Sequence, residues 1–243
     1  MYLSMEFKRS MHNMFIAVFL ILNVAAVGLG YILLVALDKV SVVTASVLAE
    51  SVYTVYTQFG LFFFAPLFIY TVSGDYKDKT IAFYRTLKYI PLTYFIQKLL
   101  FIFICSVIGA LISSVLVYAP YGDCTVLPFF FLKVLSVMTF FGIATLFLAF
   151  MSGKFIVAFF TAVILWITGI IISQAAAPLR YFAYYDAVAQ DYETFIHFLR
   201  GELPAHNIAL HITHNVIFNT AVLTVSLLAV SLCKKQWIKN GMH

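Results

Sequence analysis

Four histidines late in the chain are the first residues whose type suggests chemistry. They are His197, His206, His211 and His214. His211 and His214 are three positions apart, a spacing that places both imidazoles on one helical face. A metal site also needs converging ligands, usually with a carboxylate or a thiolate among them. The nearest acidic residues, Glu193 and Glu202, have no ligand spacing, so we expect interfacial histidines and no metal site.

Motifs of membrane enzymes and of ATP binding are absent from the sequence. There is no G-x-S-x-G, no H-E-x-x-H and no pair of carboxylates within an apolar stretch, whereas intramembrane proteolysis or lipid transfer needs such groups. The G-x-x-x-x-G-K-[ST] phosphate loop is also missing. The cysteines Cys105, Cys124 and Cys233 lack metal-ligand spacing. We therefore predict that the chain is not an enzyme and holds no cofactor.

The overall composition is that of a protein whose main solvent is lipid. Apolar residues make up 63% of the chain and charged residues 10%, and the mean hydropathy is +1.00. A span needs about 20 apolar residues to cross about 30 Å of hydrocarbon, so 243 residues can hold six spans with short loops. Basic residues that flank spans account for the net charge of +5, so we expect membrane lipid as a partner and no nucleic acid.

Apolar runs between charged or turn-rich breaks predict an all-α polytopic protein with a single transmembrane domain, residues 1–243. The predicted spans are residues 14–37, 52–72, 99–118, 126–150, 155–172 and 215–232, after an interfacial helix over residues 1–13. An even number of spans puts both termini on one side of the membrane.

The distribution of basic residues predicts which side that is. Eleven lysines and arginines fall on the side of the termini and four on the other. The eleven are Lys8, Arg9, Lys77, Lys79, Arg85, Lys88, Lys98, Lys154, Lys234, Lys235 and Lys239, and the four are Lys39, Lys133, Arg180 and Arg200. Because basic residues in short loops stay in the cytoplasm, we expect cytoplasmic termini in a plasma membrane, and we expect that membrane to be bacterial.

Two charged residues, Glu50 and Lys133, lie close to predicted spans. Glu50 precedes Asp75 by 25 residues, and Lys133 precedes Lys154 by 21. At about 1.5 Å per residue, each separation exceeds the hydrocarbon thickness of about 30 Å, which places both charges near the outer interface. We expect them to snorkel toward water, because an ion in mid-bilayer costs at least about 2.5–3.5 kcal/mol. The alternative hypothesis is that Glu50 and Lys133 flank an outer gate.

The longest predicted cytoplasmic loop, residues 73–98, is the most charged segment of the chain. Ile81, Tyr84 and Leu87 share one helical face, whereas Arg85 and Lys88 lie on another. This spacing predicts a short amphipathic helix parallel to the membrane. Residues 1–14 predict a second amphipathic helix, in the inner interface. Taken alone, each helix could be a plain connector at the membrane surface.

The order of features in this loop is more specific than its amphipathic spacing. A cluster of acidic and basic residues and a threonine, residues 75–80, precede the short helix, and a turn at Pro91 leads to Tyr-Phe-Ile-Gln-Lys98. A tight inner turn, Met151-Ser-Gly-Lys154, and a basic tail, Cys-Lys-Lys-Gln-Trp-Ile-Lys, follow later. In this order, and in layout over nearly its whole length, the chain resembles the ABC-2 type permeases of ABC transporters.

The resemblance implies that residues 73–98 carry a coupling helix, which docks on a separate ATP-binding subunit. The implied contact residues are Asp75, Tyr76, Lys79, Thr80, Phe83 and Arg85. It also implies a second permease subunit, the same or homologous, and ATP and Mg bound by the partner rather than by this chain. The implied activity is export by alternating access of a hydrophobic, lipid-like or drug-like compound or an amphipathic peptide.

Two other classes of function stay open. Ion-coupled secondary transporters use buried acidic groups or histidines, and acidic residues are nearly missing from the predicted spans. A membrane immunity or assembly protein that only binds a partner needs no such groups.

The predicted outer segment, residues 173–214, is rich in aromatic residues. They are Tyr181, Phe182, Tyr184, Tyr185, Tyr192, Phe195 and Phe198. Because aromatic rings favour the headgroup level of a bilayer, we expect this segment to lie on or dip into the outer leaflet. Related exporters place short re-entrant helices here, so the resemblance implies that the segment shapes the outer exit.

Overall fold

The computed structural model is a bundle of helices and describes residues 2–40, 42–86, 89–122, 124–175, 177–187 and 189–233. Within these residues, six helices are long and apolar enough to cross a membrane. They are α2 (Phe15–Ala36), α3 (Ala45–Lys77), α5 (Pro91–Tyr118), α6 (Leu127–Ser152), α7 (Phe155–Ser173) and α9 (Ala205–Leu232). The prediction of an all-α protein with six spans is confirmed for the described part of the chain. Lys88, Lys234, Lys235 and Lys239, which contribute to the predicted orientation, lie outside it.

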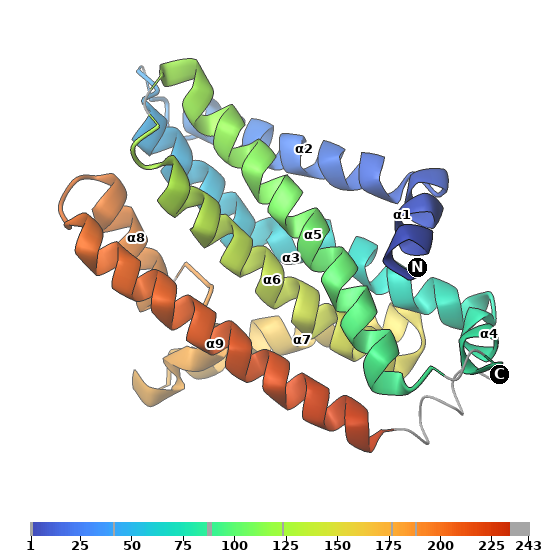
Figure 1. Ribbon diagram of the computed structural model, residues 1–243. Helices are drawn as coiled ribbons and strands as arrows, with labels where there is room; N and C mark the ends of the chain where they lie inside the picture. The colour runs from blue at the N-terminus through green and yellow to red at the C-terminus, as the bar shows by residue number, and fades with distance from the viewer. Residues whose placement is uncertain are drawn as a thin grey trace.

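Short elements lie at both ends of the bundle (Figure 1). The helices α1 (Tyr2–His12) and α4 (Thr80–Thr86) lie at one end, which we call the α4 end. The helix α8 (Gln190–Leu199) and the 3₁₀ turn η1 (Ala119–Tyr121) lie at the opposite end, the α8 end. A second 3₁₀ turn, η2 (Ala177–Ala183), connects α7 to the α8 region. Helix α9 runs back from the α8 end to the α4 end (Figure 1).

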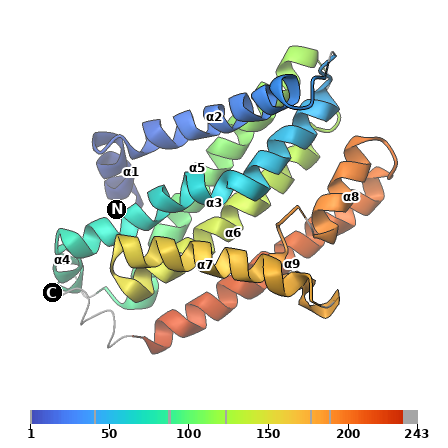
Figure 2. The ribbon, with the colours of Figure 1, turned by 180° about the vertical axis from the view of Figure 1, so that it is seen from behind.

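Helix α6 occupies the centre of the bundle, packed against α3, α5, α7 and α9. Helices α3 and α6 are the most buried spans, whereas few residues of α7 and α9 are buried. Figure 2, seen from behind, shows α7 lying over the face of the bundle that α9 does not cover. The exposed side chains of α7 and α9 include Phe160 and Leu228, and such apolar surfaces are compatible with lipid contact.

Three spans are longer than the apolar pattern predicted. Helix α3 extends from Ala45 to Lys77, α5 begins at Pro91, and α9 begins at Ala205. Proline is favourable in the first turn of α5, because the missing N–H has no partner within the helix there. The predicted loop of residues 73–98 is therefore largely helical, and the predicted outer segment of residues 173–214 ends where α9 starts. The extensions of α3 and α5 contain charged residues and that of α9 contains three histidines, and the pattern treated these residues as lying outside the spans.

A small polar cluster joins α2, α3 and α5 inside the bundle. The Tyr56 hydroxyl donates to Asn23 Oδ1 at 2.7 Å and lies 2.6 Å from Ser113 Oγ. Asn23 Nδ2 donates to the Phe19 carbonyl at 2.8 Å. Gly109 leaves the space for this amide, because a Cβ there would lie 2.7–2.9 Å from three Asn23 side-chain atoms. The cluster satisfies polar groups that lipid cannot satisfy.

Replacing Gly109 by alanine tests whether this close approach matters. We expect G109A to lower the free energy of unfolding by about 1–3 kcal/mol, because the new methyl group must displace the Asn23 amide from Tyr56. The measurement is an SDS titration in mixed micelles, followed by circular dichroism. The matched control is Gly28→Ala in α2, where no atom lies within 4 Å of the added Cβ. This variant should gain about 0.5–1 kcal/mol of helix stability, and an equal loss in both variants would contradict the argument.

Candidate functional site

The α4 end contains a cluster of four charged residues from three helices, which we call the inner charge cluster. Its members are Glu6 and Arg9 of α1, Asp75 of α3 and Lys98 of α5. Lys98 Nζ lies 2.7 Å from Asp75 Oδ2 and 3.0 Å from Glu6 Oε2, and Arg9 pairs with Asp75 Oδ1. Glu6, Asp75 and Lys98 are buried. The two positive and two negative groups balance, as buried charges require.

Arg9 is the most accessible member of the cluster and also reaches outward. Its side chain is 32% exposed, and Nη2 lies 3.7 Å from the exposed carboxylate of Asp78. Partial burial by itself lowers the pKa of the Arg9 guanidinium. The charge of the Asp75 carboxylate and its hydrogen bond to Arg9 raise this pKa by more, so the pKa is above its usual value. The guanidinium therefore stays charged and keeps α1 attached to the end of α3.

Two tyrosines extend the inner charge cluster to α4. The Tyr94 hydroxyl donates to Asp75 Oδ2 at 2.8 Å, and the Tyr84 hydroxyl donates to Glu6 Oε1 at 3.2 Å. The two rings are 5.6 Å apart. Ile81 and Tyr84 of α4 are buried, as the amphipathic spacing of this segment predicted, and Leu87, the third residue of that face, lies outside the described residues. The short helix α4 is thus tied through Tyr84 to α1 and through its apolar face to α3.

The six residues implied as coupling contacts divide into two groups. Asp75 and Tyr76 are buried in the extended α3, where the Tyr76 hydroxyl donates to the Phe150 carbonyl of α6 at 3.0 Å. These two side chains face the interior of the bundle, so in this arrangement their surfaces are not accessible to a partner. They lie near the end of α3, just before α4, where Tyr76 ties α3 to α6 and Asp75 ties it to the inner charge cluster.

The other implied contact residues lie on or next to α4. Lys79 and Phe83 are exposed, Phe83 to 52%, and Thr80 is half-buried. The side chain of Arg85 lies outside the described part of the structure. Lys79 has a positive φ of 56°, which marks the turn from α3 into α4. The exposed pair Lys79 and Phe83 forms a small surface at the α4 end, which we call the α4 face.

The α8 end contains a second buried ion pair, between α6 and α8. Lys133 Nζ lies 2.5 Å from Asp191 Oδ1, and both side chains are almost fully buried. The expectation that Lys133 snorkels to the interface is wrong, because Asp191 of α8 enters the bundle and neutralises it there. The Tyr53 hydroxyl of α3 lies 3.4 Å from Asp191 Oδ2, and Lys133 Nζ lies 5.7 Å from the centre of the Phe195 ring. The pair and these two neighbouring side chains thus join three helices, α3, α6 and α8.

Helix α9 completes the surroundings of Asp191. With its amide oriented to satisfy its neighbours, Asn215 donates to Asp191 Oδ1 at 2.8 Å and accepts from Lys133 Nζ at 3.2 Å. His211 Nδ1 lies 3.9 Å from Asp191 Oδ1. Asn219, one turn further along α9, donates to the Ser136 carbonyl of α6 at 3.0 Å. The buried face of α9 is thus largely polar where it meets α6.

Glu50 has a different environment from Lys133, although both were candidates for an outer gate. The Glu50 carboxylate accepts from Arg200 Nη2 at 2.6 Å and from Nε at 3.3 Å. The Arg200 side chain is 54% exposed. The pair joins the start of α3 to the end of α8 at the surface, where an ion pair contributes at most about 1 kcal/mol. The structure does not bring Glu50 and Lys133 together, but both contact the α8 region.

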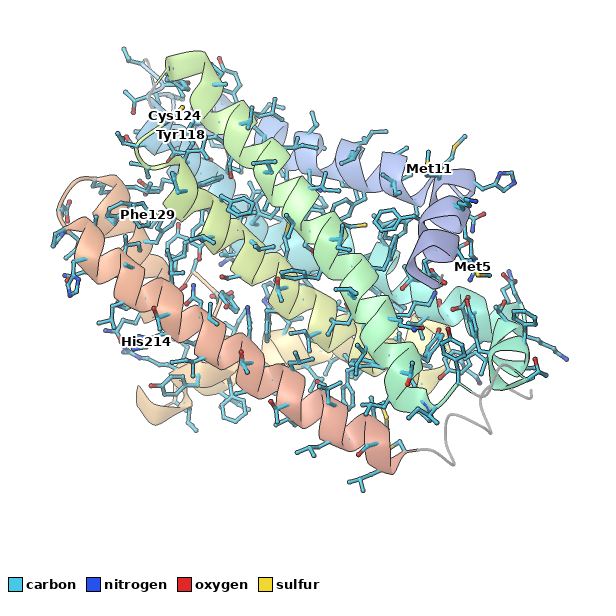
Figure 3. The ribbon with its side chains drawn as sticks, viewed as in Figure 1. Met5, Met11, Tyr118, Cys124, Phe129 and His214 are labelled. Atoms are coloured by element: carbon cyan, nitrogen blue, oxygen red, sulfur yellow. The ribbon has the colours of Figure 1, made fainter. Side chains whose placement is uncertain are left out.

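The two ends of the bundle can be followed in Figure 3. Met5 and Met11 mark α1 at the α4 end, whereas Tyr118, Cys124 and Phe129 mark the α8 end. The inner charge cluster and the Lys133–Asp191 pair therefore lie at opposite ends of one bundle.

Comparison with known proteins identifies the family. The model of the peptide export permease protein YydJ family matches residues 3–242. The chain belongs to this family. A relative is the probable peptide export permease protein YydJ of Bacillus subtilis (strain 168), to which the chain is 26% identical. The alignment runs over 249 residues and covers 99% of this chain and 100% of the relative. No solved structure matches the chain.

Membership in the peptide export permease family agrees with the layout of the sequence. It confirms the expected resemblance to ABC-2 type permeases, and it shows that the chain is a multi-pass membrane protein and a transmembrane permease subunit of an exporter. The role of this family is transport rather than catalysis.

Sequence reasoning missed four residues that the structure makes central: Glu6, Lys98, Asp191 and Asn215. Lys98 lies at the edge of a predicted span, where the sequence predicts a basic residue that only sets the orientation of the chain in the membrane. Once Pro91 is taken as the first residue of the helix, Lys98 falls two turns inside it. Asp191 carried a weaker signal, as one of few acidic residues in an aromatic segment. Its partner, Lys133, is 58 positions away.

Proposed function

We propose that this chain is the permease subunit of an ATP-driven exporter of amphipathic or hydrophobic peptides. ATP, with its Mg, would bind separate ATP-binding subunits, and a second permease subunit, identical or homologous, would complete the transporter. The peptide substrate is suggested by the name of the matched relative, a probable peptide export permease. By the distribution of basic residues, the α4 end faces the cytoplasm, with both termini on that side of the plasma membrane.

The observation that carries the proposal is the attachment of α4 to three other helices. The α4 face, Lys79 and Phe83, is exposed at the end of the bundle. Behind it, Tyr84 contacts Glu6, which pairs with Lys98. Because buried ion pairs hold a fixed geometry, a push on α4 would move α1, α3 and α5 together.

The α8 end supplies the second half of an alternating-access cycle. Helix α8 is held to α6 by the buried Lys133–Asp191 pair and to α3 by the exposed Glu50–Arg200 pair. We assign these contacts to the outer gate, which would be closed in the arrangement described. Movement transmitted from the α4 end along α3 would open the gate by separating α8 from the ends of α3 and α6. The charges are then gate residues, and they need not bind an ion.

Co-purification tests the proposed partner. Tagged wild-type protein, taken from its native membrane in mild detergent, is expected to bring down a P-loop ATPase subunit with measurable ATPase activity. The double variant Lys79→Glu/Phe83→Ala should reduce the recovery of that subunit about tenfold or more, because an exposed aromatic residue and a charge at the centre of a contact can each contribute more than about 1 kcal/mol.

The matched control for Lys79 is Lys39→Glu. Lys39 is also exposed, has a positive φ of 52° and lies at the α8 end of the bundle, so the control repeats the charge reversal and the backbone setting far from α4. It should bring down as much ATPase as the wild type. Failure of wild-type protein to bring down any ATPase would refute the ATP-driven mechanism. Equal losses with Lys39→Glu would refute the assignment of the α4 face.

A further inference from the structure

An apolar cavity of about 330 Å³ lies between α3, α6, α7 and η2. Its lining includes Phe140 and Ala144 of α6, Trp166 of α7, and Phe182 of η2. Most of the lining is aromatic or aliphatic, and it includes one acidic residue, Asp186. The volume is at the lower end of the range of about 300–1,000 Å³ found for ligand sites in proteins. We call this cavity the apolar chamber.

A second cavity, of about 410 Å³, lies between the η2 region, the start of α8 and α9. Its lining includes Arg180, Gln190, Asp191, His211 and His214. Figure 3 shows the labelled His214 on α9, on the side of that helix where η2 lies. Unlike the first cavity, this one offers hydrogen-bond donors and acceptors of several kinds. We call it the polar chamber.

Among the residues that the structure describes, Tyr184 alone lines both chambers. Its ring stacks on Phe218 of α9 with the ring centres 4.1 Å apart, and its hydroxyl lies 2.9 Å from the side-chain amide of Asn215. Next to it, Tyr185 packs against Phe140 of α6, with the ring centres 5.3 Å apart. The partition between the chambers is therefore an aromatic side chain, fixed by stacking at its face and by a hydrogen bond at its tip.

We propose that the two chambers form one substrate site, which binds an amphipathic peptide segment across Tyr184. An apolar side chain of the peptide occupies the apolar chamber, against Phe140 and Trp166. The neighbouring backbone amides and polar side chains occupy the polar chamber, against Gln190 and His214. The inference deepens the proposed function and rests on it for the class of substrate.

The polar chamber favours a peptide over a phospholipid. A peptide backbone presents an N–H donor and a C=O acceptor at nearly every residue, and the chamber offers partners for both. The amide oxygen of Gln190 accepts, whereas Arg180 and the Gln190 amide nitrogen donate. The phosphodiester and ester groups of a phospholipid only accept, and any donors it has are confined to the end of the headgroup, whereas a peptide offers both kinds of group along its whole length.

The intrinsic fluorescence of Trp166 provides the binding measurement. The chain has two tryptophans, so Trp237→Phe leaves Trp166, in the wall of the apolar chamber, as the single reporter. The probe is a synthetic nonapeptide in which leucine and phenylalanine alternate with serine and lysine, added to the purified full-length protein in detergent without nucleotide. We expect a saturable change in emission. A nonapeptide of serine and lysine, and short-chain phosphatidylglycerol, should each leave the emission unchanged.

Two pairs of variants locate the bound peptide. Ala144→Phe, which fills the apolar chamber, should weaken binding about tenfold to a hundredfold, since it excludes one apolar side chain. The control Ala209→Phe adds the same ring at an exposed position of α9 that lines neither chamber. His214→Ala should weaken binding about threefold to tenfold through the loss of a hydrogen bond, and His206→Ala, at an exposed position outside both chambers, should not.

The outcomes separate this site from the proposed mechanism. No saturable change with the amphipathic peptide, or unchanged affinity in Ala144→Phe, would overturn the site. A response to phosphatidylglycerol alone would make the apolar chamber a lipid site and also overturn it. Peptide binding by a protein that brings down no ATPase would support the site and refute the ATP-driven mechanism. The reverse result would support the mechanism and refute the site.

Discussion

Replacing Lys133 by methionine is expected to lower the free energy of unfolding by about 3–5 kcal/mol, because it leaves the buried carboxylate of Asp191 without a counter-charge. Lys133 and Asp191 are 0% and 3% exposed at the side chain, so neither can reach water without separating α6 from α8. An SDS titration in mixed micelles, followed by circular dichroism, gives the difference from wild type.

The double variant Lys133→Met/Asp191→Leu shows whether the loss comes from the uncompensated charge. An apolar pair of similar volume often replaces a buried ion pair at little cost, so we expect the double variant to recover most of the stability of the wild type. The exposed pair gives the matched control, since Glu50→Gln should cost less than about 1 kcal/mol. A double variant that is no more stable than K133M would show that the charge is not the cause.

The same double variant also tests whether the Lys133–Asp191 pair is part of the outer gate. If the Lys133–Asp191 pair only stabilises the fold, the stable apolar variant should export peptide at the rate of the wild type. The gate assignment predicts a changed export rate at preserved stability, because α8 is then held by contacts of different strength. An unchanged rate would remove Lys133 from the gate.

Replacing Asp75 by asparagine is expected to have an effect of similar size at the other end of the molecule. The substitution keeps the shape of the side chain but changes the inner charge cluster from balanced to an excess of one positive charge, with Arg9 and Lys98 sharing Glu6. We expect a loss of about 3–5 kcal/mol in the free energy of unfolding. We also expect faster hydrogen exchange in α1, since α1 is attached to α3 through Arg9.

Asp78→Asn is the control for this prediction. Asp78 belongs to the same turn and also faces Arg9, at 3.7 Å, but its side chain is 62% exposed. Its loss should cost less than about 1 kcal/mol and leave exchange in α1 unchanged. If both variants behave alike, burial of Asp75 does not set the strength of the cluster. If D75N keeps its stability but loses ATPase-dependent export, the cluster serves coupling alone.

The sequence determined the number of spans and their order. In lipid, each segment must form its own backbone hydrogen bonds, whatever its neighbours are. Every segment of about 20 apolar residues must satisfy its own backbone as a helix, so runs such as residues 126–150 could be read without knowing their neighbours. The amphipathic spacing of Ile81 and Tyr84 was likewise a local property, and it placed their side chains on the buried face of α4.

The tertiary structure alone decided which charges meet. Lys98 pairs with Glu6 across 92 residues of sequence, and Lys133 pairs with Asp191 across 58. No local pattern selects such partners, since the choice depends on how helices far apart in the sequence pack. For the same reason the ends of α3 and α5 could not be predicted. A charged residue ends a span when it must face lipid, but it continues the helix when another helix supplies its counter-charge.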